Sequence, residues 1–257
     1  MEFYKYEGAG NDFILIDDRS EVFPDGNVDL IAKMCDRHFG IGADGLMLLR
    51  NKDGYDFEMV YFNSDGRPSS MCGNGGRCIT QFASDLGVIQ GEAHFLAVDG
   101  PHHAKLLSMS GVSLQMGDVH IIESLDQQAV FLNTGSPHYV APTSGVSAMD
   151  IVDFGRSIRY SDRFRQEGVN VNAVEWLDGR LYIRTYERGV ENETLACGTG
   201  VTAAAIAAHH WGWTDSPVNV KAEGGDLEVS FEEVNGNYRN VWKSGPATFV
   251  FKGNYEL

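Results

Sequence analysis

Two short segments of this chain each place a cysteine beside glycines, at a point where a helix is expected to begin. They are Met71-Cys72-Gly73-Asn74-Gly75-Gly76-Arg77 and Ala196-Cys197-Gly198-Thr199-Gly200-Val201-Thr202. The first turn of a helix carries free N–H groups and the positive end of the helix dipole. Each thiol should therefore have a pKa below the usual value of about 8.5. The two segments predict two reactive cysteines.

Two such thiols can act as a matched base and acid on one carbon atom. A thiolate can remove the proton from the α-carbon of an amino acid while a thiol on the opposite face delivers another, which inverts the centre. The two groups must be in opposite protonation states and titrate as a coupled pair. The helix N-termini behind them would also hold the substrate carboxylate and its growing negative charge.

The rest of the chain predicts a mixed α/β fold with many short strands and few helices. The helices are expected over 27–39, 74–86, 147–160 and 199–210. Cys35 and Cys78 lie on the inner faces of two of them and are expected in the core. The last helix is apolar on nearly every side, which is typical of a buried helix. Strand-like stretches, such as Ala104–Met109, occupy much of the remainder.

The order of these elements suggests an internal duplication. Each half of the chain holds several strands, an outer helix, and an inner helix that follows a cysteine loop. A boundary near Gly117 would give domains 1–117 and 118–245, with Cys72 in the first and Cys197 in the second. A single irregular α+β domain is the alternative.

Composition excludes several classes of partner. The 257 residues carry a net charge of −16, which argues against nucleic acid and against anionic membrane surfaces. The N-terminus has no apolar signal-peptide region, and no apolar run approaches the roughly 20 residues of a membrane span. We therefore expect a cytoplasmic protein. Its four cysteines are not expected to form structural disulfides, and their spacing does not match a zinc site.

Several motifs resemble those of the diaminopimelate epimerases, and they occur along nearly the whole chain. They are 8–13 (GAGNDF), 37–45 (RHFGIGADG), 62–66 (FNSDG), 71–78 (MCGNGGRC), 135–138 (GSPH), 168–170 (GVN), and 186–190 (YERGV) running into 195–200 (LACGTG). The combination of the two cysteine motifs is highly specific. The resemblance implies an epimerase of lysine and peptidoglycan-precursor biosynthesis that needs no cofactor, neither pyridoxal phosphate nor a metal.

The resemblance also implies an architecture. Each of two pseudo-symmetric domains would be a strand layer wrapped on a central helix, with the active site in the cleft between the domains. The last strand, about 246–257, would cross back to the first domain. The protein would be a homodimer that binds a small amino-acid substrate.

The same resemblance assigns roles to individual residues. Cys72 and Cys197 would be the two acid–base residues, although the motifs do not say which acts on which stereoisomer. Asn11 would help to fix the substrate backbone. Main-chain donors to the reacting carboxylate would come from Gly73, Asn74, Gly198 and Thr199.

The distal end of the substrate would meet a second group of residues. Asn63 and Asn170 would line its pocket, and Arg188 would grip the distal carboxylate through its forked guanidinium. Glu187 and His138 match residues near the thiols, which would adjust the protonation of the thiols or hold the substrate ammonium.

Two positions depart from the family pattern, and two alternatives stay open. Ser136 stands where an Asn is common and Gly45 where a Gln is common, which leaves recognition of the distal end unsettled. A proline or hydroxyproline racemase is one alternative, although those enzymes typically have His at the position of Asn74. A non-catalytic or redox thiol protein of the same fold is the other.

Overall fold

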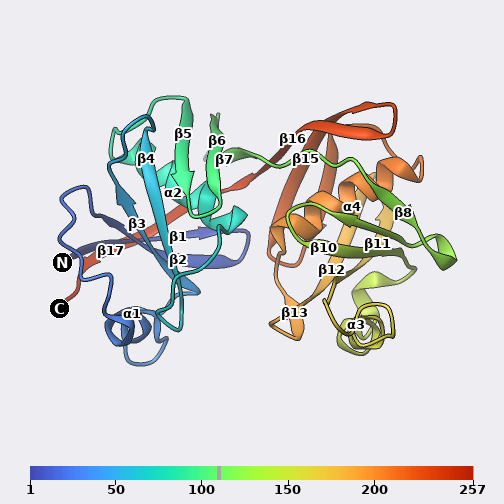
Figure 1. The fold of residues 1–257 in the computed structure, drawn as a ribbon, viewed down its shortest axis with the longest axis horizontal. Coiled ribbons are helices and arrows are strands. Elements are labelled where there is room, and N and C mark those ends of the chain that lie inside the picture. The colour runs from blue at the N-terminus through green and yellow to red at the C-terminus, as the bar shows by residue number, and fades with distance from the viewer. Residues whose placement is uncertain (109–110, 257) are drawn as a thin grey trace. The chain divides into compact units, whose positions relative to one another are not determined.

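The computed structural model describes residues 1–108 and 111–256, and the chain divides into two compact units (Figure 1). The first unit is Met1–Leu114 together with Gly245–Leu257, and the second is Gln115–Ser244. The chain therefore returns to its first unit after completing the second.

In the first unit the strands form a sheet in the order β17–β1–β2–β3–β4–β5–β6–β7. The elements are β1 (Glu2–Gly8), β2 (Asn11–Asp17), α1 (Val28–Cys35), β3 (Gly45–Arg50), β4 (Phe57–Asn63), α2 (Gly73–Asp85), β5 (Glu92–Ala97), β6 (Gly100–Leu107), β7 (Gly111–Gln115) and β17 (Thr248–Asn254). Met109, which the sequence placed in a strand, lies outside the described residues. The pairs β2–β3 and β4–β5 are parallel, and α1 and α2 form the connections between their strands.

The second unit repeats this plan in the order β8–β9–β10–β11–β12–β14–β15–β16. Its elements are β8 (Ile122–Ser124), η1 (Asp126–Gln128), β9 (Val130–Asn133), β10 (Pro137–Pro142), η2 (Val146–Ala148), α3 (Ile151–Arg159), β11 (Asn170–Leu177), β12 (Arg180–Glu187), β13 (Asn192–Thr194), α4 (Gly198–His210), β14 (Val218–Ala222), β15 (Gly225–Val234) and β16 (Asn237–Pro246). Here β10–β11 and β12–β14 are the parallel pairs, connected by α3 and α4. The mixed α/β fold with two similar halves is thus confirmed.

The central helix of each unit is buried along most of its length. In α4, every residue of the stretch Gly200–Ala208 is buried, and most of these side chains are small and apolar. This helix contacts β10, β12 and β14, while α2 contacts β1, β2 and β3. A helix that is apolar all round can gain stability only by burial, which is why α4 occupies the middle of its unit.

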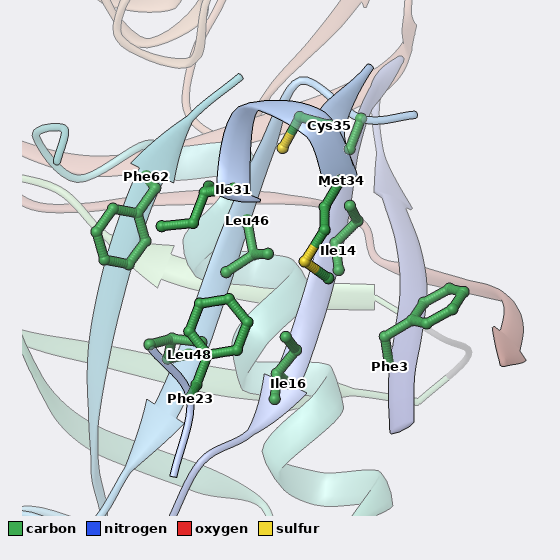
Figure 2. Close-up of a cluster of buried hydrophobic side chains, with 11 residues drawn as sticks. Phe3, Ile14, Ile16, Phe23, Ile31, Met34, Cys35, Leu46, Leu48 and Phe62 are labelled. Atoms are coloured by element: carbon green, nitrogen blue, oxygen red, sulfur yellow. The ribbon is translucent and has the colours of Figure 1, made fainter. Parts of the chain in front are cut away.

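The outer helix of the first unit covers the opposite face of the sheet from α2. Figure 2 shows Ile31 and Met34 of α1 directed toward a cluster of buried side chains from β2, β3 and β4. Those strand residues are Ile14, Ile16, Leu46, Leu48 and Phe62. The side chain of the intervening Met47 points to the opposite face, toward α2. Its Cε lies only 2.1 Å from the position that a Cβ on Gly75 of α2 would take. The alternation of strand side chains thus supplies both faces of the sheet.

Two helix ends differ from the sequence prediction. Helix α1 ends at Cys35 rather than at residue 39, because the Asp36 side chain accepts hydrogen bonds from the N–H groups of His38 and Phe39 and holds a turn. Helix α3 begins at Ile151 rather than at residue 147. Asp150 caps it, and the preceding Val146–Ala148 forms a separate 3₁₀ turn. No helix within residues 1–108 and 111–256 is long and apolar enough to cross a membrane.

Candidate functional site

Cys72 lies directly before α2, in the first unit. It is the N-cap residue of that helix, with extended backbone (φ −105°, ψ 123°), and its carbonyl accepts the first helical bond from Gly76 N at 2.7 Å. The thiol makes no capping hydrogen bond and is partly exposed. The predicted placement of this thiol at a helix N-terminus is therefore confirmed.

Glycines allow the first turn of α2 to pack against the sheet. A Cβ on Gly76 would stand 2.6 Å from the side chain of Met71, and one on Gly75 would overlap Met47. Arg77 follows on the same helix and is completely buried, with its Nε donating to Pro246 O at 3.2 Å. A guanidinium keeps its charge even when buried, so a positive group stands behind the Cys72 loop.

Asn11 and Asn74 are joined by a direct hydrogen bond. Asn74 Nδ2 donates to Asn11 Oδ1 at 2.7 Å, and Asn11 Nδ2 donates to Asp44 Oδ2 at 2.9 Å. Asp44 is held in turn by Arg37 at 2.8 Å. The orientation of the Asn11 amide is therefore set by protein groups on both of its polar atoms.

Asn63 and Gly45 lie at the same end of two paired strands. Asn63 closes a turn in which its carbonyl accepts from Gly66 N at 2.9 Å, and it is exposed. Gly45 is its register partner, and a Cβ there would stand 2.5 Å from the ring of Tyr61. Tyr61 therefore occupies the space beside Gly45 that a larger residue would need.

Cys197 occupies the corresponding position before α4, in the second unit. It is the N-cap residue of α4, is 8% exposed, and its Sγ lies 3.5 Å from Thr199 Oγ1. The prediction of a lowered pKa is wrong for this thiol. Burial, together with the nearby Glu187 carboxylate, raises the pKa of Cys197 to about 11, and the Thr199 hydroxyl and Gly200 N–H offset this only in part. Desolvation of a thiolate outweighs the helix dipole at this site.

Glu187 ends β12 and belongs to the surroundings of Cys197. Its Oε2 accepts a hydrogen bond from Thr194 Oγ1 at 2.9 Å, and burial raises the pKa of its carboxyl. The resemblance placed this carboxylate near a thiol. The negative charge of Glu187 opposes ionisation of Cys197.

Replacing Glu187 by glutamine should make Cys197 easier to ionise. Loss of the negative charge removes a cause of the raised pKa, so the apparent pKa of Cys197 should fall by about one unit. The measurement is the pH dependence of Cys197 alkylation, read on its own peptide by mass spectrometry. Glu228→Gln, in β15 of the same unit, is the matched control. An unchanged or higher pKa in Glu187→Gln would show that this carboxylate does not act on the thiol.

His138 lies in β10 and is completely buried. Its Nε2 is 2.9 Å from Thr199 Oγ1, which connects it to the Cys197 loop. Burial and the positive charge of Arg188 lower the pKa of His138 to about 3, so the ring is neutral at physiological pH. The resemblance placed His138 near a thiol, and in the structure it is a buried residue of β10 whose ring bonds to Thr199, two positions after Cys197.

Asn170 and Arg188 are adjacent across two strands. Asn170 Oδ1 accepts from the main-chain N–H of Arg188 at 2.9 Å, and the exposed Arg188 side chain donates from Nη1 to Glu167 O at 2.8 Å. A Cβ on Gly168 would stand 2.4 Å from Arg188 Cδ. Gly168, which also has a positive φ of 78°, therefore lets the Arg188 side chain lie across this loop.

Some of the predicted residues of each unit are in contact with one another. In the first, Asn11 and Asn74 are bonded to each other; in the second, the Cys197 and Thr199 side chains are in contact and His138 bonds to Thr199. Sequence reasoning missed Tyr61, which fills the space beside Gly45, and Asn172, which bonds to His138. It also missed Thr185, which bonds to Asn172. Each of the three lies in a strand just outside a recognised motif, so no pattern marked it. Among the described residues, no group of three or more His, Cys, Asp or Glu side chains could hold a metal ion.

Comparison with known proteins decides the family. The family model for diaminopimelate epimerase matches residues 3–122 and 130–250. The chain belongs to the diaminopimelate epimerase family. It is 51% identical to a diaminopimelate epimerase of Flavobacterium psychrophilum over 254 residues, covering 98% of this chain and 99% of that protein. The resemblance seen in the motifs is confirmed, and as a member of this family the protein is an isomerase.

Solved structures share the fold at low sequence identity. A phenazine biosynthesis protein of the PhzF family from Bacillus anthracis has a TM-score of 0.75 at 12% identity, covering 100% of this chain and 99% of the other. A probable proline racemase from Agrobacterium radiobacter has a TM-score of 0.69 at 14% identity, with 100% and 93% covered. At this identity the likeness concerns the fold alone.

Proposed function

We propose that this isomerase interconverts L,L- and meso-diaminopimelate by proton transfer at the α-carbon, in lysine and peptidoglycan-precursor biosynthesis. Family membership over nearly the whole chain is the observation that carries the proposal. The geometry agrees with it, because each unit has a cysteine at the N-terminus of its buried helix. Two thiols so placed suit a two-base reaction.

The two thiols have different surroundings, which suits opposite roles. Cys197 has a pKa of about 11 and is a thiol at neutral pH, so it would deliver the proton in the resting enzyme. Cys72 is partly exposed and would take the other role, that of the base. After one turnover the roles are exchanged, and reaction in the opposite direction restores the first state.

The helix N-termini would hold the carboxylate next to the reacting carbon. The main-chain N–H groups of Gly73, Asn74, Gly198 and Thr199 are candidates, because the first N–H groups of a helix have no partner within it. As the α-proton leaves, negative charge moves onto this carboxylate. Donors already in place stabilise that charge without reorganisation.

The distal end of the substrate would be read by Asn63, Asn170 and Arg188. Arg188 is exposed and held by its backbone bond to Asn170. Its guanidinium can bind a carboxylate through two parallel hydrogen bonds. A proline-type substrate has no distal carboxylate and gives this arginine no partner.

We also propose that the enzyme works in the cytoplasm as a homodimer and without a cofactor. The edge strand β17 supports the dimer, because Phe249, Val250 and Phe251 are 47%, 51% and 43% exposed on it. An apolar edge strand in water favours association. Sedimentation velocity of the purified protein tests this, and a monomer at working concentration would contradict it.

The experiment that tests the function is proton NMR of the purified protein with L,L-diaminopimelate in deuterated water, with no cofactor added. We expect the α-proton signal to disappear as the meso isomer forms, because solvent deuterium replaces the abstracted proton. Exchange on proline but not on diaminopimelate would assign a sister specificity. No exchange on any amino acid, with all four thiols shown to be reduced, would overturn the proposal.

A further inference from the structure

A continuous series of hydrogen bonds leads from the core of the second unit to Cys197. Thr185 Oγ1 donates to Asn172 Oδ1 at 2.9 Å, and Asn172 Nδ2 lies 3.1 Å from His138 Nδ1. His138 Nε2 lies 2.9 Å from Thr199 Oγ1, which lies 3.5 Å from Cys197 Sγ. Asn172 and His138 are completely buried, so water does not compete for these bonds.

The direction of each bond follows from what Asn172 can do. Its Oδ1 accepts from Thr185, and its Nδ2 donates both to Tyr139 O at 3.0 Å and to His138. These partners on both sides fix the orientation of the amide. An amide nitrogen can only donate, so His138 Nδ1 must be the unprotonated acceptor.

A neutral imidazole whose Nδ1 accepts carries its hydrogen on Nε2. That hydrogen points to Thr199 Oγ1, which therefore accepts from His138. The Thr199 hydroxyl has one hydrogen of its own, and with His138 as donor this hydrogen is available to Cys197 Sγ. The lowered pKa of His138 agrees with a ring that stays neutral.

We propose that Asn172 is a positioning residue that holds His138 as its Nε2–H tautomer and thereby aims the Thr199 hydroxyl hydrogen at the sulfur of Cys197. A hydrogen bond to the charged form of a group favours that form. The Thr199 hydroxyl thus stabilises the Cys197 thiolate, which has to form in a site where burial and Glu187 oppose it. The proposal deepens the proposed function and rests on it, since it assumes that Cys197 releases and takes up a proton during the reaction.

The packing around Gly200 shows how closely the groups of this series are held. A Cβ at Gly200 would stand 2.6 Å from Asn172 Oδ1, 3.2 Å from Cys197 Cβ and 3.4 Å from His138 Cε1. Any larger residue at position 200 would therefore press on the hydrogen-bonded side chains.

Two charged groups also act on the Cys197 thiol. Glu187 raises its pKa and Lys243 lowers it.

The first test reads the tautomer directly in the unmodified protein. Nitrogen-15 NMR of the histidine rings should show His138 with hydrogen on Nε2 and none on Nδ1. In Asn172→Leu, which cannot donate, we expect a mixture of both tautomers. Hydrogen on Nδ1 of His138 in the unmodified protein would overturn the proposal, even if the Asn172 variant fails to fold.

The second test measures ionisation of Cys197 by alkylation with iodoacetamide across pH, in a Cys72→Ala background. Thr199→Val removes the hydroxyl and should raise the apparent pKa of Cys197 by about one unit, which slows alkylation about tenfold at a fixed lower pH. Thr199→Ser keeps the hydroxyl and should restore the original pKa. The matched control is Thr202→Val on the same helix, whose hydroxyl donates to the main-chain Gly198 O at 3.2 Å.

The two outcomes of this second test are distinct from those of the proposed function. The same pKa in Thr199→Val and Thr202→Val would overturn the role of the Thr199 hydroxyl. Alkylation needs no substrate, so it gives a result whether or not the enzyme acts on diaminopimelate. Absence of isotope exchange with an intact Thr199 effect would count against the function and not against the hydrogen-bond series.

Discussion

Replacing either Cys72 or Cys197 by serine will reduce isomerisation by at least about a thousandfold, the scale of a lost general acid or base. A serine hydroxyl has nearly the shape of the thiol but is far less acidic, so it cannot cycle between base and acid near neutral pH. Both cysteines are N-cap residues of extended backbone, and serine is favoured at that position. The loss should therefore come from chemistry and not from unfolding.

The measurement is the rate at which the meso isomer forms from L,L-diaminopimelate, beside a thermal melt of each variant. Cys35→Ala is the control, because Cys35 is a buried residue of α1 with its side chain in the apolar cluster of the first unit. Its rate should stay close to that of the unmodified enzyme. If either the Cys72 or the Cys197 variant still inverts the centre at nearly the original rate, the two-base mechanism is wrong.

Replacing Arg188 by lysine will raise the KM for diaminopimelate by about ten- to a hundredfold. An ammonium offers a single point charge where the guanidinium offers two parallel donors, so at least one charge-assisted hydrogen bond to the distal carboxylate is lost. The distal end is remote from the reacting carbon, so kcat should change less than KM. Steady-state kinetics in both directions provides the measurement.

Arg165→Lys is the matched control for this prediction. Arg165 is also an exposed arginine of the second unit, and it pairs with Asp162 at 3.2 Å. Its replacement should leave KM unchanged. An unchanged KM in Arg188→Lys as well would remove Arg188 from substrate binding and would reopen the question of what recognises the distal end.

Much of the local structure around the two cysteines could be predicted from the sequence. Glycines after a cysteine and an apolar stretch after the glycines predicted helices from about residues 74 and 199, and the structure begins them at Gly73 and Gly198. The all-round apolar pattern also predicted that the second of these helices is buried. These features depend on residues within one or two helical turns of each other, which is why a linear pattern reveals them.

The ends of the outer helices already depended on details that the pattern did not resolve. Asp36 turns its side chain back onto the following N–H groups and ends α1 early, and Asp150 starts α3 late. Asp36 competes with the helix for backbone hydrogen bonds, whereas Asp150 accepts from first-turn N–H groups that have no partner within the helix. Periodicity alone extends a helix through such residues.

The protonation behaviour of the site was decided only by the tertiary structure. The N-terminal position of Cys197 on its helix predicted an easily ionised thiol, yet burial and Glu187 raise its pKa to about 11. Asn172 and His138 come from neighbouring strands, 34 residues apart in sequence, and no motif connects them. The sequence by itself determined which thiols stand at helix N-termini, because that is local. Only folding determined how readily Cys197 ionises, because desolvation and charge at a sulfur atom depend on whatever the fold packs around it.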